Sequence, residues 1–177
     1  MSEIEKLKEI PLFHDFSGAM LEEFSGYFKH SNYRGGDVIF REKTIGDILY
    51  IIVSGEVVIE KAMDTEGREF KTLAILAGGD FFGEMAVIEG AVRFAQARAS
   101  MDTALYEVDR RHFFSFIKER PETGISIFSG IMRTLFRRLQ HTSNELTMLF
   151  DLSRLLLARH KSPAEFFSAV VDEMRIY

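Results

Sequence analysis

The chain has 177 residues, 46% apolar and 28% charged, with a formal net charge of −5 and no Cys. This length suits one domain with an appendage, and the missing Cys excludes disulfides, Cys-ligated metals and a thiolate nucleophile. The acidic balance argues against nucleic acid as the main partner. The N-terminus resembles no secretory signal and no apolar run approaches the roughly 20 residues of a membrane helix, so we expect a cytoplasmic protein without a membrane partner.

Residues 1–30 are predicted to be helical. A short amphipathic piece stops at Pro11, and Ser17 is suited to cap a second helix. The apolar face of that second helix comprises Met20, Leu21, Phe24 and Phe28.

Residues 31–108 show a β-type pattern. Gly-Asp pairs at 36–37, 46–47 and 79–80 each precede a short apolar run, as expected for tight turns that lead into strands. Several short strands with frequent turn signals predict a mainly β sandwich, barrel or jelly roll. The expected strands are 38–40, 48–53, 57–59, 70–76, 81–82, 95–99 and 104–108.

After Asp109 the pattern becomes helical, with one helix at Arg111–Glu119 and a long one from Pro121. The long helix carries a heptad seam with a single polar member, which predicts a homodimer through residues 125–149. Packing of the seam on the chain's own barrel is the alternative. A second apolar flank, formed by Ile127, Ile131 and Phe136, could pack on the barrel instead. The seam consists of Ile125, Phe128, Met132, Leu135, Leu139, Thr142, Leu146 and Leu149.

Residues 151–177 are predicted to form a tail of two short helices. A capping box with Pro at its first turn begins at Ser162. The apolar face that follows, 166–174, is expected to fold back on its own domain or dimer rather than to bind a foreign partner.

The pattern of reactive side chains does not indicate an enzyme. The five His residues form no metal-ligand pair of the H-x-H or H-E-x-x-H type, and the sequence contains no nucleophile elbow and no P-loop. We therefore expect no catalytic residues, no metal and no cofactor.

The segment 79–99 is the exception, because it combines a glycine-bounded turn with two opposite charges. Gly83 precedes Glu84, Gly90 closes the turn, and Arg93 follows among apolar and small residues. A guanidinium in such a setting needs a partner, and it suits a phosphate, whereas the carboxylate suits sugar hydroxyls. An internal Glu84–Arg93 salt bridge without a ligand is the alternative.

Four motifs carry a resemblance to a known family over about residues 8–150. The stretch F-G-E-M-A-V-I-E-G-A-V-R-F-A-Q (82–96) resembles the phosphate-binding cassette of the cyclic nucleotide-binding domain family. Residues 10–17 and 46–57 resemble the entry motif and the G-D-x-x-Y-x-I-x-x-G-x-V strands of that family, and 137–143 is similar to the long helix of its catabolite activator branch. The resemblance implies an eight-stranded double-stranded β-helix jelly roll with flanking N-terminal helices (1–120), a long dimerisation helix (121–150) and the tail (151–177).

The same resemblance implies roles for individual residues. Glu84 matches the acid that binds the ribose 2′-hydroxyl, and Arg93 matches the Arg that pairs with the cyclic phosphate. Thr142 and Ser143 match helix residues that reach the purine, one of them from the opposite subunit. The implied ligand-binding set comprises Phe82, Gly83, Glu84, Met85, Ala86, Arg93, Phe94, Ala95, Thr142 and Ser143, where Gly83, Met85 and Ala86 match backbone donors.

Phe94 departs from the family pattern, which has Ser, Thr or Ala after the Arg. The hydroxyl that would contact the phosphate is lost, and the ring is expected to pack against the base or to fill the pocket. Because a Thr there is associated with cGMP, its absence favours cAMP, with cGMP as the second choice. If the ring fills the pocket, the chain is a degenerate, ligand-free scaffold or protein-interaction module. Val92, in place of the Pro of many members, is a second departure.

The C-terminal part also departs from the activator branch, which continues into a helix-turn-helix domain. The residues after Leu149 are fewer than the roughly 50 that an independent domain needs. We therefore expect no DNA binding by this chain alone and an output to an unknown effector protein. A fragment of a transcription regulator lacking its helix-turn-helix domain is the alternative.

Overall fold

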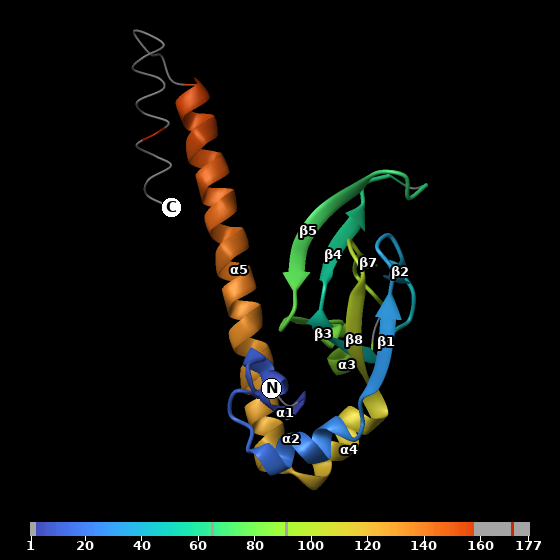
Figure 1. Cartoon of the computed structure of the whole chain (residues 1–177). Helices are drawn as coiled ribbons and strands as arrows, with labels where there is room; N and C mark the ends of the chain where they lie inside the picture. Colours follow the sequence, from blue (N-terminus) through green and yellow to red (C-terminus); the bar gives the residue numbers. More distant parts are fainter. Residues whose placement is uncertain (1–2, 65, 91, 158–170, 172–177) are drawn as a thin grey trace. The chain divides into compact units, whose positions relative to one another are not determined.

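The computed structural model describes residues 3–64, 66–90, 92–157 and 171 (Figure 1). The chain divides into two compact units between Ile131 and Met132, and helix α5 (Pro121–Leu157) continues through this division. Within the described residues, no helix combines the length and the apolarity that crossing a bilayer requires.

The N-terminal helices form as predicted, apart from their last residues. Helix α1 (Glu3–Lys8), the 3-10 turn η1 (Pro11–Phe13) and helix α2 (Gly18–Ser25) follow one another. The Ser17 side chain accepts a hydrogen bond from the Met20 N–H at 3.2 Å, which confirms it as the N-cap. The prediction of helix up to residue 30 was wrong, because strand β1 already begins at Lys29.

The β region forms two four-stranded antiparallel sheets, which confirms the mainly β prediction (Figure 1). One sheet has the order β1-β8-β3-β6 and the other the order β2-β7-β4-β5. Every strand expected from the sequence is present within a few residues, and β1 is additional. The strands are β1 (Lys29–Tyr33), β2 (Val38–Phe40), β3 (Ile48–Ser54), β4 (Glu56–Ala62), β5 (Phe70–Ala77), β6 (Phe81–Phe82), β7 (Gln96–Ala99) and β8 (Thr103–Asp109).

The hydrophobic core joins the inward faces of both sheets. Ile52, Phe82 and Leu105 come from the first sheet, and Val57 and Ala97 come from the second; all five are at most 2% exposed. The rings of Tyr50 and Phe82 stack 4.9 Å apart in the same core.

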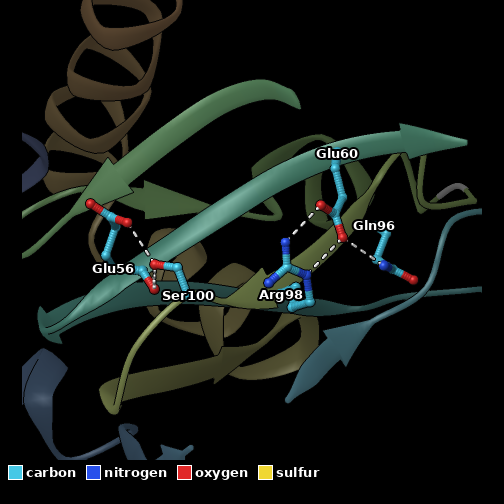
Figure 2. Close-up of polar contacts among 5 residues, drawn as sticks. All are labelled: Glu56, Glu60, Gln96, Arg98 and Ser100. Carbon is cyan, nitrogen blue, oxygen red and sulfur yellow. Dashed lines mark hydrogen bonds and ion pairs between the residues drawn. The ribbon is translucent and has the colours of Figure 1, made fainter. Parts of the chain in front are cut away.

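A polar network covers the other face of strands β4 and β7. Glu60, Gln96 and Arg98 alternate along their strands with the core residues, so their side chains point away from the core. Figure 2 shows the Glu60 carboxylate accepting hydrogen bonds from Arg98 through Nε (3.0 Å) and Nη2 (3.1 Å) and from Gln96 Nε2 (2.9 Å). The Glu60 carboxylate is thus buried but satisfied. A shorter hydrogen bond, of 2.6 Å, runs from the Ser100 hydroxyl just after β7 to the Glu56 carboxylate on β4.

The helices after β8 agree in part with the sequence. Helix α4 (Arg110–Glu119) begins at the N-cap Asp109, and α5 follows from Pro121. Ile127 and Ile131 are buried, but Phe136 is 58% exposed, so the predicted second flank is only two residues long. Residues 151–157 continue α5 rather than beginning a tail of short helices, and the predicted helix beyond Ser162 lies outside the described residues except for Val171. The seam residues Ile125, Met132, Leu139, Leu146 and Leu149 are each more than half exposed.

The Glu60–Arg98 pair generates a testable prediction about stability and pH. The hydrogen bonds from Arg98, and a further one from Gln96, hold the pKa of Glu60 below its ordinary value of 4.5 against the opposing effect of burial. Arg98→Met leaves a buried carboxylate without its cation, so we expect a loss of about 2 kcal/mol in the free energy of unfolding at neutral pH. A carboxyl group whose pKa is lower in the folded than in the unfolded protein stabilises the fold at pH values above its unfolded pKa. This contribution is lost as the pH falls through the folded pKa. The difference in the free energy of unfolding between wild type and Arg98→Met should therefore shrink below about pH 4.5.

Urea unfolding of both proteins between neutral and acidic pH measures this difference. Arg68→Met is the matched control, since Arg68 pairs with Glu66 on the open surface and should show no such loss. A difference between wild type and Arg98→Met that is constant across this range would contradict the assignment to the Glu60 carboxylate.

Candidate functional site

The segment singled out in the sequence forms a short helix closed by a glycine at each end. Strand β6 ends at Phe82, helix α3 spans Glu84–Glu89, and Gly90 follows it. Gly83 and Gly90 both adopt left-handed backbone conformations, with φ of 83° and 68°. Other residues rarely adopt this conformation, which explains the glycine on either side of α3.

Arg93 lies beside the start of this helix, and the residue is only 5% exposed. Nη1 donates to the carbonyl oxygen of Gly83 at 3.1 Å, and Nη2 donates to that of Ile48 at 2.9 Å. The guanidinium carbon lies 4.2 Å from the centre of the Phe40 ring, a cation–π distance. The side chain is therefore held in one orientation by strand β3, strand β2 and the start of α3.

The charge of Arg93 is only partly compensated in this position. Burial lowers the pKa of Arg93, and Tyr50, Asp47 and Glu84 oppose that effect electrostatically. The guanidinium remains protonated at neutral pH. Its Nε is buried and has no hydrogen-bond partner, so one donor of the buried cation is unsatisfied. An unsatisfied buried donor is costly unless a further acceptor binds there.

The structure brings part of the predicted ligand-binding set together. Phe82, Glu84 and Ala86 are buried with Arg93, and Glu84 acts on Arg93 through its charge. Met85 and Phe94 are 46% and 56% exposed, and Ala95 is half-buried. The ring of Phe94 does not fill the interior, contrary to the ligand-free alternative, and the Nη groups of Arg93 bind backbone carbonyls rather than an acid.

Thr142 and Ser143 lie exposed on α5, in the second unit. The Thr142 hydroxyl donates to the Arg138 carbonyl oxygen at 3.1 Å, within the same helix. Their predicted contact with a purine stays a prediction.

Sequence reasoning missed the surroundings of Arg93. A Cβ atom placed on Gly46 would lie 2.0 Å from Nε of Arg93, so this glycine is required by close packing. The carbonyl of Ile48 and the ring of Phe40 also contact Arg93. The Gly46-Asp47 pair was a signal in the sequence, but it was interpreted as a turn and as the start of a family motif, not as a contact of Arg93. No group of three or more acidic or His side chains among the residues with described positions could hold a metal ion.

The two antiparallel sheets with α3 between glycines define a jelly-roll binding domain. The crystal structure of the Thermus thermophilus catabolite activator protein has the same fold, with a TM-score of 0.67 at 31% identity; the match covers 82% of this chain and 66% of that one. Residues 30–120 match the family model of the cyclic nucleotide-binding domain, and the chain belongs to this family.

Two curated relatives support the same assignment. The chain is 31% identical over 143 residues to the cyclic AMP receptor protein of Thermus thermophilus, a match that covers 81% of this chain and 63% of the relative. It is 36% identical over 114 residues to a CRP-like cAMP-activated global transcriptional regulator of Mycobacterium tuberculosis, covering 64% and 48%. The matches thus span about half to two thirds of these relatives.

The close packing of Gly46 against Arg93 predicts a steric conflict on substitution. Gly46→Ala should lower the free energy of unfolding by about 1–3 kcal/mol, because the new methyl group overlaps the guanidinium. Gly18→Ala, where the added Cβ would meet its nearest neighbour at 3.6 Å, serves as the control and should cost little. In an Arg93→Ala background the cost of Gly46→Ala should largely disappear, as a double-mutant cycle by urea unfolding would measure. Equal costs in both backgrounds would contradict the steric explanation.

Proposed function

We propose that this chain is a regulatory module that binds a cyclic purine nucleotide, with cAMP as the first choice and cGMP as the second. The observation that carries the proposal is the buried guanidinium of Arg93, whose Nε lacks an acceptor. Its two Nη groups donate to backbone carbonyls and its Nε packs against Gly46, so the surroundings of the guanidinium must shift for an anionic oxygen to reach it. A phosphate supplies such an oxygen and compensates the buried charge.

The second half of the proposed site is the Glu84 carboxylate. It lies on the first residue of α3 and is close enough to influence the Arg93 pKa. A carboxylate accepts hydrogen bonds from hydroxyl donors, and a ribose hydroxyl is such a donor. An anion-binding cation beside a hydroxyl-binding acid suits a nucleotide better than a free phosphate or a free sugar.

The choice of cAMP rests on the relatives and on Phe94. One curated relative is named a cyclic AMP receptor protein and the other a cAMP-activated regulator. Phe94 brings no hydroxyl to the position after Arg93, and its side chain is more than half exposed. We further propose that the module acts by binding rather than by catalysis, in the cytoplasm.

Signal transfer is proposed to run through α5. The exposed seam on this helix is unusual for a solvated surface, and pairing with a second copy would bury it. In the proposed mechanism the ligand contacts Arg93 and Glu84 in the jelly roll and Thr142 and Ser143 on α5. The ligand stabilises only those positions of α5 that allow both sets of contacts, so binding shifts the population of conformations towards these positions. A partner protein would detect that shift.

Ligand binding is tested through thermal and chemical stability. At about 100 times its dissociation constant, cAMP should raise the free energy of unfolding by about 2.7 kcal/mol, whereas AMP, which has no cyclic phosphate, should have a smaller effect. Arg93→Ala should abolish the gain, and Arg68→Ala, a change on the open surface, should leave it intact. Calorimetric titration with cAMP and cGMP gives the affinities. No gain with any cyclic nucleotide would overturn the proposal, and a gain retained by Arg93→Ala would place the site elsewhere.

The dimer is tested by one substitution on the seam and one beside it. Leu139→Arg puts a charge on the seam and should raise the dimer dissociation constant by about 30-fold or more, as expected for a central interface residue. Gln140→Arg, at the neighbouring exposed position outside the seam, should change it little. Sedimentation equilibrium measures both constants. A wild-type protein that stays monomeric at high concentration would contradict the proposed dimer.

A further inference from the structure

Arg110, the first residue of α4, connects that helix to the end of α3. Its Nη1 donates to the carbonyl oxygens of Val87 and Ile88, the latter at 3.0 Å. These carbonyls lie in the last turn of α3, where a helix leaves its own acceptors without N–H donors. A cation in this place also interacts favourably with the negative end of the helix.

The local packing holds the Arg110 guanidinium at this place. A Cβ atom on Gly90 would lie 3.4 Å from the guanidinium carbon, an ordinary van der Waals separation, so the guanidinium lies directly beside the glycine that ends α3. One turn along α4, the Phe114 ring lies 4.8 Å from the same carbon. The side chain is thus fixed between the end of one helix and the ring of the other.

The main chain of Arg110 reaches towards Arg93. Its N–H donates to the Asp47 carbonyl oxygen at 2.6 Å. Asp47 follows Gly46, which packs against Arg93, and its carboxylate raises the Arg93 pKa. Arg110, at the start of α4, therefore forms hydrogen bonds both to the loop beside Arg93 and to the end of α3.

We propose that Arg110 is a positioning residue that makes α4 follow α3, so that a ligand bound beside Glu84 and Arg93 is detected at α4. This inference rests on the proposed function, because the ligand is what would displace α3. Two hydrogen bonds from one fixed guanidinium couple the two helices more tightly than apolar contact alone, since separation would leave both carbonyls unsatisfied. From α4 the displacement reaches α5, whose Gly124 N–H donates to the Arg120 carbonyl oxygen at 2.9 Å.

The coupling of α3 to α4 through Arg110 is tested first without ligand. Arg110→Met keeps the apolar stem and removes the donors, and Arg110→Lys keeps the charge without the planar guanidinium. Amide hydrogen exchange of α3 and of the first turn of α4 should rise together by about fivefold or more in Arg110→Met, with Arg110→Lys in between. The control Arg111→Met, at the next and exposed position, should match wild type. Unchanged exchange at either helix would overturn the proposed connection, whether or not the chain binds a nucleotide.

Ligand coupling is tested next, with cAMP as the probe. In wild type, cAMP should slow exchange in both α3 and α4. In Arg110→Met it should still slow exchange in α3, with the affinity reduced by about fivefold to tenfold, while the effect on α4 is lost. Retention of the α4 effect would contradict a positioning role, and loss of the α3 effect as well would make Arg110 part of the binding site instead. If wild type binds no cyclic nucleotide, the proposed function fails. The hydrogen-exchange measurement without ligand still decides whether Arg110 couples α3 to α4.

Discussion

The arrangement around the cassette depends on one buried cation. The Arg93 guanidinium is held by the carbonyl oxygens of Ile48 and Gly83, so a strand of one sheet and the start of α3 are joined through a single side chain. Burying a charge is costly, and this cost is partly offset by backbone acceptors, an aromatic ring and nearby acids rather than by a direct ion pair. Because the acceptors belong to the main chain, their positions depend on the fold and not on flexible side chains.

This requirement explains the positions of several glycines. Gly46 leaves room for the guanidinium, and Gly83 provides the left-handed turn that aims its carbonyl at Nη1. Gly90 repeats the left-handed conformation at the other end of α3, where the Arg110 guanidinium approaches. The guanidinium of Arg98 is different in kind, since it is only partly buried and makes a direct ion pair with the buried Glu60 carboxylate (Figure 2). Arg98 thus satisfies a buried acid, whereas Arg93 keeps one buried donor without an acceptor.

Local features of the structure could be predicted from the sequence, whereas contacts between distant segments could not. The Ser17 cap and the strands after Gly-Asp pairs depend on a few adjacent residues, and they were found.

Strand β1 was missed because its exposed edge carries little apolar alternation. The Ile48 carbonyl partner of Arg93 was missed because it is 45 positions away and comes from the main chain, which has no sequence signature. The exposure of Phe94 and Phe136 could not be inferred, since an aromatic residue in an apolar pattern is usually buried. The extension of α5 beyond residue 150 was missed because the helix was predicted to end with its apolar seam. The sequence has no helix-breaking residue between that point and Pro163, so the helix can continue.

The exposure of Phe94 has a practical consequence for spectroscopy. The chain contains no Trp, so it has no indole fluorescence of its own. Phe94 is the residue after the buried Arg93 and is itself more than half in solvent, so the site should accept a slightly larger ring without disturbing the core. An indole introduced there would be the single Trp in the chain. Excited at the red edge of its absorption, where the five Tyr absorb little, it would report on the polarity beside the guanidinium.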